Sequence, residues 1–284
     1  MEMGAVSGDI RKSVIAGTWY PGSSRVLRAD IEHYFHNVPD VVIDGKIIGL
    51  VAPHAGYMYS GQVAAYAYKV IRGIGFDAVI VIGPSHRTHF RGVSVYDRGG
   101  YETPLGVVPV DVDLARSIIE QNELISYMPA AHLQEHSVEI QLPFLQVALG
   151  GVHFVPLMMG DQSKEICEIL SESIWRAVGD RKVLIVGSSD LSHFYSYERA
   201  VKLDSVVLGH IEKMDHSALL KDLENDVCEA CGGGPIIVTI MVSKKLGADR
   251  AGLLKYANSG DVTGDTKGVV GYASAVFYDS HAPV

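Results

Sequence analysis

Three short apolar runs, each followed within a few residues by a histidine, constrain the fold of this chain most strongly. They cover residues 47–52, 78–82 and 183–186, and each leads into a turn of small residues. Aliphatic runs without polar alternation indicate strands buried on both faces, as in a parallel sheet covered by helices. The carboxyl ends of neighbouring parallel strands lie along one edge, where ligands of open α/β sheets bind. We therefore expect the side chains that follow these runs to share one site.

The three histidines are His54, His86 and His193, and Asp190 precedes the last of them. A neutral imidazole can offer one ring nitrogen to a metal while a neighbouring acceptor holds the other nitrogen. Two such histidines after consecutive strands favour a metal site over isolated hydrogen bonds within loops. Asp190 is expected to ligate a cation or to orient His193, which is placed as a general base. Alternatively, Asp190 and the serines beside it cap the next helix.

The rest of the chain alternates between helical and extended patterns. The expected helices are residues 23–37, 60–71, 111–123, 163–178, 197–213, 215–224 and 235–246. The expected strands are residues 46–52, 77–82, 92–96, 106–110, 152–157, 182–187, 251–258 and 269–278. This order predicts a single α/β domain over residues 1–284, with a mostly parallel central sheet flanked by helices.

Composition excludes several classes of protein. The formal net charge is −9 and there is no cluster of lysine and arginine, which argues against nucleic acid as a partner. No apolar stretch approaches the roughly 20 residues needed to span a bilayer. The first residues contain no apolar signal core. We therefore expect a cytoplasmic protein that does not associate with membranes.

Cys231 lies in a turn and is followed by three glycines. A thiolate beside a cation is a good ligand for soft and borderline metals. Two alternatives remain open: the glycines cradle a phosphate at a helix N-terminus, or Cys231 is only a small buried residue. Cys228 and Cys231 form a C-x-x-C pair, but no second pair lies at zinc-finger spacing, so a structural zinc site is not favoured.

A second polar cluster contains His132, His136 and Glu139. On a helix, His132 would share a face with His136, and His136 with Glu139. Glu135 precedes the second histidine directly, so the zinc-protease motif H-E-x-x-H is not matched. We predict that His136 and Glu139 contact the metal ligands from outside or line the wall of the pocket.

Together these segments resemble the MEMO family. The matching segments are AGTWYPG (16–22), APHAGYMYSG (52–61), GPSHR (83–87), TPLG (103–106), EHSVEIQLPFL (135–145), SSDLSH (188–193) and ACGGGP (230–235). The resemblance implies the fold of the class III extradiol (LigB-type) dioxygenases. It also implies metal ligands at His54, His86 and Cys231, with Asp190 and His193 in the same pocket.

The resemblance further shapes the expected chemistry. Extradiol dioxygenases hold Fe(II) with two histidines and a carboxylate, whereas here Cys231 takes the place of the carboxylate. We expect one divalent or redox metal ion, iron or copper before zinc, and redox or oxygen chemistry on a small substrate. The alternative is a non-catalytic module whose cleft binds a peptide or another partner. Family association also implies AMMECR1-like and radical SAM partners.

Overall fold

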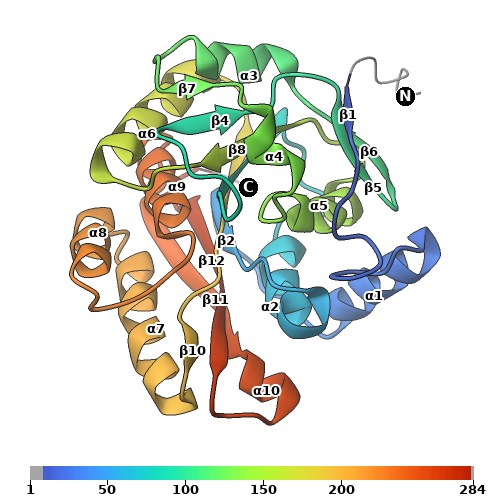
Figure 1. The fold of residues 1–284 in the computed structure, drawn as a ribbon, viewed down its shortest axis with the longest axis vertical. Coiled ribbons are helices and arrows are strands. Elements are labelled where there is room, and N and C mark those ends of the chain that lie inside the picture. Colours follow the sequence, from blue (N-terminus) through green and yellow to red (C-terminus); the bar gives the residue numbers. More distant parts are fainter. Residues whose placement is uncertain (1–8, 283–284) are drawn as a thin grey trace.

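A nine-stranded mixed sheet runs through the computed structural model, which describes residues 9–282 (Figure 1). In spatial order its strands are β10 (His193–Tyr195), β12 (Val269–Asp279), β2 (Lys46–Ala52), β9 (Val183–Ser188), β3 (Ala78–Pro84), β8 (Phe154–Met159), β4 (Val93–Val95) and β7 (Ile125–Ser126), and β11 (Arg250–Asn258) pairs with β12. The neighbours β2, β9, β3 and β8 are parallel, whereas β12 is antiparallel to β2 and β4 is antiparallel to β8. The predicted α/β class, with a mostly parallel centre, is confirmed.

Burial explains why these runs form the centre of the sheet. Every residue of β3, β8 and β9 is buried, and in β2 only Lys46 is exposed. A strand that presents aliphatic side chains to both faces removes them from water only when helices cover both faces. The absence of polar alternation in the sequence therefore indicates that these strands lie in the interior of the sheet.

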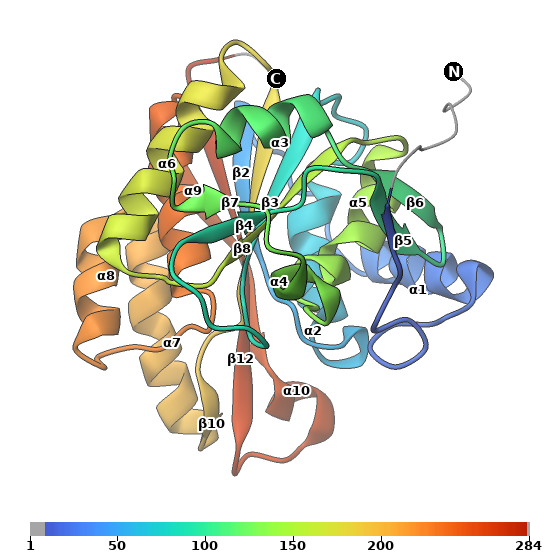
Figure 2. The ribbon, with the colours of Figure 1, turned by 45° about the horizontal axis from the view of Figure 1, so that its top comes forward.

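Helices cover the two faces (Figure 2). The helix α2 packs against β2 and β12, and α1 and α5 pack against α2. On the other face α9 packs against β9, β2 and β3, with α6 and α8 against α9, while α7 packs against α8, β11 and β12. The bounds of these helices are α1 (Ser24–His36), α2 (Tyr57–Lys69), α5 (Leu142–Leu149), α6 (Lys164–Val178), α7 (Tyr197–Glu212), α8 (His216–Glu224) and α9 (Gly233–Lys245).

Several short elements differ from the expectation. The segment before residue 106 contains β5 (Gly100–Thr103), which forms a small sheet with β1 (Ile10–Arg11) and β6 (Gly106–Pro109). Helix α3 (Val112–Ile119) ends before residue 123, and beyond its end the Asn122 side chain accepts the Leu124 N–H at 2.9 Å in a turn. The remaining elements are α4 (Pro129–Leu133), a 3-10 turn η1 (Glu139–Gln141) and α10 (Ser259–Thr263).

Among residues 9–282, no helix combines the length and the apolar character that crossing a membrane requires.

Candidate metal centre

The loops after β2, β3 and β9 meet at one edge of the sheet. The strand β9 lies between β2 and β3, and Ala52 at the end of β2 pairs with Ser188 at the end of β9. A cavity of about 660 Å³ opens at this edge. Its lining includes Thr18, Trp19, His54, Ala55, Gly56, Met58, Tyr59, His86, Arg87, His136, Asp190, His193, Val270 and Tyr272. The sheet topology therefore brings together the side chains that follow the three apolar runs.

Three imidazoles form the floor of this cavity. One donor atom from each of His54, His86 and His136 lies within 4.8 Å of the other two, so the group could hold a metal ion. The ring of His54 is nearly perpendicular to those of His86 and His136, with centroids 5.1 and 5.5 Å away. The rings of His86 and His136 stack at 4.6 Å with an interplanar angle of 20°.

One buried carboxylate, that of Glu135, holds two of these imidazoles. Its Oε1 lies 3.0 Å from His86 Nδ1 and 3.3 Å from His136 Nδ1. It also accepts the backbone N–H groups of His86 (2.6 Å), His136 (2.9 Å) and Ser137 (2.9 Å). A carboxylate at Nδ1 leaves Nε2 of each ring for a metal, which is how carboxylate–histidine–metal sites are built. Burial alone would raise the pKa of Glu135, but the histidines and the Ser137 amide hold it well below its usual range.

A hydroxyl fixes the tautomer of His54. Ser188 Oγ donates its single proton to the Ser137 carbonyl at 2.6 Å and accepts from Gln141 Nε2 at 2.8 Å. It lies 3.1 Å from His54 Nδ1. Since its proton is already used, Ser188 accepts from Nδ1–H, and His54 Nε2 keeps its lone pair. Burial, followed by the charges of His136 and His86, lowers the pKa of His54 well below its ordinary value, so the ring is neutral and ready to bind a metal.

Cys231 joins the group through His54. Its Sγ lies 3.1 Å from His54 Nε2, and it accepts the Asp190 N–H at 3.3 Å. Burial first, and then the nearby Asp190 carboxylate, raise the pKa of the Cys231 thiol above its ordinary value. Without a cation beside it, the thiol is therefore neutral and donates to His54 Nε2.

Asp190 is fixed by backbone amides at the same edge. Its Oδ1 accepts the N–H groups of His54 (2.7 Å) and Ala55 (3.3 Å), and its Oδ2 lies 4.0 Å from His54 Nε2. Burial raises the pKa of Asp190 to about 7, although the two amides lower it. These hydrogen bonds hold Asp190 beside His54, where it positions the loop that carries this histidine.

His193 lies on the cavity wall and is half-buried. Its backbone N–H donates to Glu229 Oε1 at 3.1 Å, and its Nδ1 lies 3.7 Å from the same oxygen. Glu229 also accepts the Tyr195 hydroxyl at 3.0 Å. The carboxylate at Nδ1 turns the other ring nitrogen, Nε2, away from Glu229.

The second polar cluster divides into two parts in the structure. The chain does not form one helix there, because α4 ends at Leu133 and η1 begins only at Glu139. His136 lines the cavity, but Glu139 does not, because its carboxylate is fully buried among the side chains of Arg11, Ser13 and Tyr20. The structure therefore places Glu139 outside the lining of the cavity. His132 likewise points away, to Ser94 Oγ and the Tyr101 hydroxyl.

The residue that sequence reasoning missed is Glu135. In the sequence it stands out only as a poor match to the zinc-protease motif. The signal that could have identified it is a carboxylate directly before a histidine in a non-helical turn.

The glycine turn at residues 232–234 is not a phosphate cradle. Its three amides donate to protein acceptors, namely the Ser189 hydroxyl (2.9 Å), the Ala230 carbonyl (3.2 Å) and the Gln162 side-chain oxygen (2.7 Å). With these donors occupied, the turn serves to hold Cys231. The Gln162 amide also donates to the Cys231 carbonyl at 2.9 Å.

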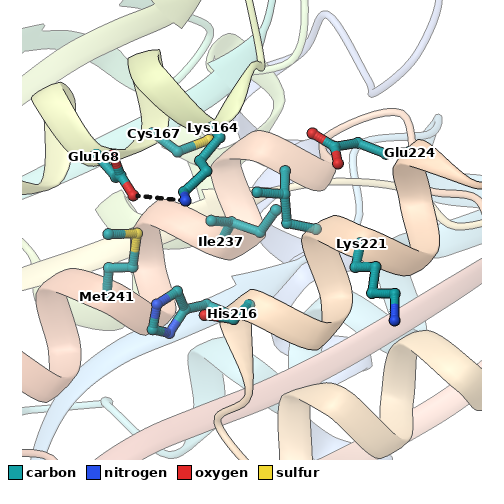
Figure 3. Close-up of a pocket in the computed structure, with 10 residues that line it drawn as sticks. Lys164, Cys167, Glu168, His216, Lys221, Glu224, Ile237 and Met241 are labelled. Carbon is teal, nitrogen blue, oxygen red and sulfur yellow. Dashed lines mark ion pairs between the residues drawn. The ribbon is translucent and has the colours of Figure 1, made fainter.

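A second, smaller cavity of about 240 Å³ lies between α6, α8 and α9 (Figure 3). Cys167, His216 and Met241 line it, and Lys164 pairs with Glu168 across 3.7 Å. Among residues 9–282, His54, His86 and His136 are the one group of three histidine, cysteine or acidic residues with donor atoms close enough for a metal. The candidate metal centre is therefore the larger cavity.

Comparisons with known proteins agree on one family. A family model described as "Memo-like protein" matches residues 11–276. The chain is 39% identical to a MEMO1 family protein of Methanobrevibacter smithii, over 94% of this chain and 99% of that protein. It is 38% identical to a MEMO1 family protein of Desulfurococcus amylolyticus, again over 94% and 99%.

A solved structure shows a related fold. An uncharacterized protein from Escherichia coli K12 superimposes with a TM-score of 0.54 at 14% identity, over 81% of this chain and 99% of that chain.

Proposed function

The chain belongs to the family of Memo-like proteins, and we propose that its cavity is a redox metal centre acting on a small substrate. The observation that carries this proposal is the carboxylate of Glu135, which holds His86 and His136 by their Nδ1 atoms beside His54. Metal-binding histidines usually donate their second ring N–H to such a carboxylate, which leaves Nε2 of His86 and His136 free for an ion.

We propose His54, His86 and Cys231 as the ligands. The sulfur of Cys231 lies 3.1 Å from His54 Nε2, so these two atoms can bind one ion. Cys231 is not part of the group whose donor atoms lie within 4.8 Å of one another, so the thiol has to move toward His86 when the ion binds. His136 is stacked on His86 with ring centroids 4.6 Å apart, and its donor atom lies within 4.8 Å of those of His54 and His86. His136 is therefore the nearby fourth donor. A set of two imidazoles and a thiolate suits iron or copper and also admits zinc.

The bound ion, His193 and Asp190 would have separate roles. A bound iron or copper ion would supply electron transfer and oxygen activation. His193 would take a proton from the substrate, or return one, at Nε2, and Glu229 holds its backbone N–H at 3.1 Å with Oε1 3.7 Å from Nδ1. Asp190 would keep the His54 loop in place through its two amide hydrogen bonds.

Calorimetric titration with Zn²⁺, in two buffers of different ionisation enthalpy, tests the ligand set. Because the neutral thiol must ionise to bind, we expect the release of about one proton per zinc ion. The Cys231→Ser variant should lose this release and bind more weakly, and His54→Ala should lose stoichiometric binding. Cys228→Ser, which removes the other thiol of the C-x-x-C pair, is the matched control. No proton release from the unmodified protein, or full zinc binding by His54→Ala, would contradict the assignment.

Oxygen consumption by the Fe(II)-loaded protein with a panel of catechols tests the chemistry separately. We expect turnover that is lost in His193→Ala, whereas the metal content of that variant stays unchanged. If the protein binds metal but turns over no catechol of the panel, the proposed oxygen chemistry is refuted and metal binding alone is supported.

The alternative function is a binding module without catalysis. Two large apolar side chains favour it: Met58 on the cavity lining is 67% exposed, and Phe194 beside His193 is 77% exposed. A contiguous apolar patch is typical of a protein-binding surface, and these two side chains are the apolar groups with which a partner in the cleft would make contact. Failure of the purified protein to bind any metal would support this function.

A further inference from the structure

Arg87 gives the cavity a positive charge that no acidic side chain neutralises. It lies on the cavity lining directly after His86 and is exposed. Within residues 9–282, neither an ion pair nor a hydrogen bond occupies its guanidinium group. Two carboxylates of the candidate metal centre have other partners, the histidines for Glu135 and backbone amides for Asp190.

Arg87 lines the cavity together with His86 and His136, so its positive charge lies at the same cavity. The N-terminus of α2 lies on the same wall, because Gly56 and Met58 line the cavity. The positive end of a helix dipole thus adds to the guanidinium charge. An anionic group would be favoured here.

Aromatic side chains form much of the remaining wall. Trp19 lies with its ring centroid 4.3 Å from that of His136, and Tyr59 and Tyr272 line the cavity as well. Flat apolar rings favour stacking against a flat ligand. The volume of about 660 Å³ is in the range of small-molecule sites.

We propose that the cavity binds a small aromatic carboxylate, whose ring lies beside Trp19 and whose carboxylate pairs with Arg87. A guanidinium group offers a planar fork that matches a carboxylate through two parallel hydrogen bonds. The inference depends on the proposed function in one respect, that the same cavity is the ligand site.

Fluorescence titration tests this pairing directly. Trp19 and Trp175 are the two tryptophans of the chain, and Trp175 is 42% exposed on α6. In a Trp175→Phe background, the emission therefore comes from the cavity. The probes are matched pairs such as benzoate with benzamide and 4-hydroxybenzoate with 4-hydroxybenzamide. Each amide keeps the shape of its carboxylate and removes the charge.

We expect each carboxylate to bind roughly tenfold more tightly than its amide, as one charge-assisted pair supports. Arg87→Gln should abolish this preference by weakening the carboxylate alone, and Arg87→Lys should keep part of it. Arg91→Gln is the matched control, because Arg91 is exposed and pairs with Glu165.

Equal affinities for the two members of each pair, or a preference that survives in Arg87→Gln, would overturn the inference. So would the absence of saturable binding by every carboxylate at about 1 mM, the affinity of a weak small-molecule ligand. The titration is run after removal of metal with a chelator and again with Zn²⁺ added. If zinc does not bind but the carboxylates still bind more tightly than the amides, the proposed metal centre is refuted and this inference is supported.

Discussion

Replacing Glu135 with glutamine tests whether one carboxylate organises the metal centre. Glu135 accepts the ring and backbone N–H groups of His86 and the backbone N–H groups of His136 and Ser137 at 3.0 Å or less, and its Oε1 lies 3.3 Å from His136 Nδ1. The amide of Glu135→Gln has the same shape, but one acceptor oxygen becomes an NH₂ donor. If that NH₂ takes the place of Oε2, it faces the His86 backbone N–H. If it takes the place of Oε1, it faces several donors at once.

The magnitude follows from the hydrogen bonds that the substitution removes. In the better orientation one charge-assisted hydrogen bond disappears and a buried N–H is left unpaired, which costs about 1.5–3 kcal/mol of folding stability. The remaining bonds are weakened because the acceptor is no longer charged. Loss of an outer partner of metal-binding histidines typically reduces metal affinity by about 10- to 100-fold. That range corresponds to about 1.4–2.7 kcal/mol.

Two measurements check these values. Competition between the protein and a chelator gives the Zn²⁺ affinity, and urea unfolding of the metal-free protein gives the stability. Glu165→Gln on α6, where the side chain is 61% exposed, is the control and should change neither quantity. A folded Glu135→Gln variant with zinc affinity within about threefold of the unmodified protein would refute the role given to this carboxylate.

Two further predictions concern acid stability and the cysteine turn. Burial, with the charge of Arg11, lowers the pKa of His132 from 6.5 to about 3, so the unfolded chain binds its proton first and stability falls as the pH drops below 6.5. Between pH 7 and pH 5 this group should cost about 2 kcal/mol. Urea unfolding at the two pH values should show that His132→Gln lacks this fall in unfolding free energy. An equal fall in the variant and the unmodified protein would contradict the reasoning. In Gly232→Ala the added Cβ would lie 2.4 Å from a backbone oxygen of β9, so we expect a loss of about 1–3 kcal/mol in unfolding free energy and weaker zinc binding. The control Gly209→Ala, where nothing lies within 4 Å of the added Cβ, should be neutral or slightly stabilising, and equal effects of the two substitutions would contradict the close approach at Gly232.

The fold was largely predictable because the composition of the strands reflects their burial. The runs at 78–82 and 183–186 have no polar residue, and each forms an interior strand with helices on both faces. The short strands β1 and β10 were not predictable, because two or three residues do not establish a period. Their pairing is decided by neighbours that are distant in sequence.

The site was predictable only where a strand end positions a side chain. His54 and His86 follow β2 and β3 directly, so the parallel sheet brings them together. The contact of Glu139 with Arg11 was not predictable, because helical spacing was assumed for a segment that turns and Arg11 lies 128 residues earlier. A long-range ion pair leaves no local pattern in the sequence.

The hydrogen bond between His54 and Cys231 joins residues 177 positions apart. An ion bound by both would therefore act as a reversible cross-link that closes most of the chain into one loop. Loop-closure entropy grows with loop length, so holding these two residues on one ion is unfavourable in the unfolded chain. At a free metal concentration about 100 times the dissociation constant, binding to the folded form alone adds about 2.7 kcal/mol of stability. The resistance of this protein to unfolding would then rise and fall with the metal supply around it.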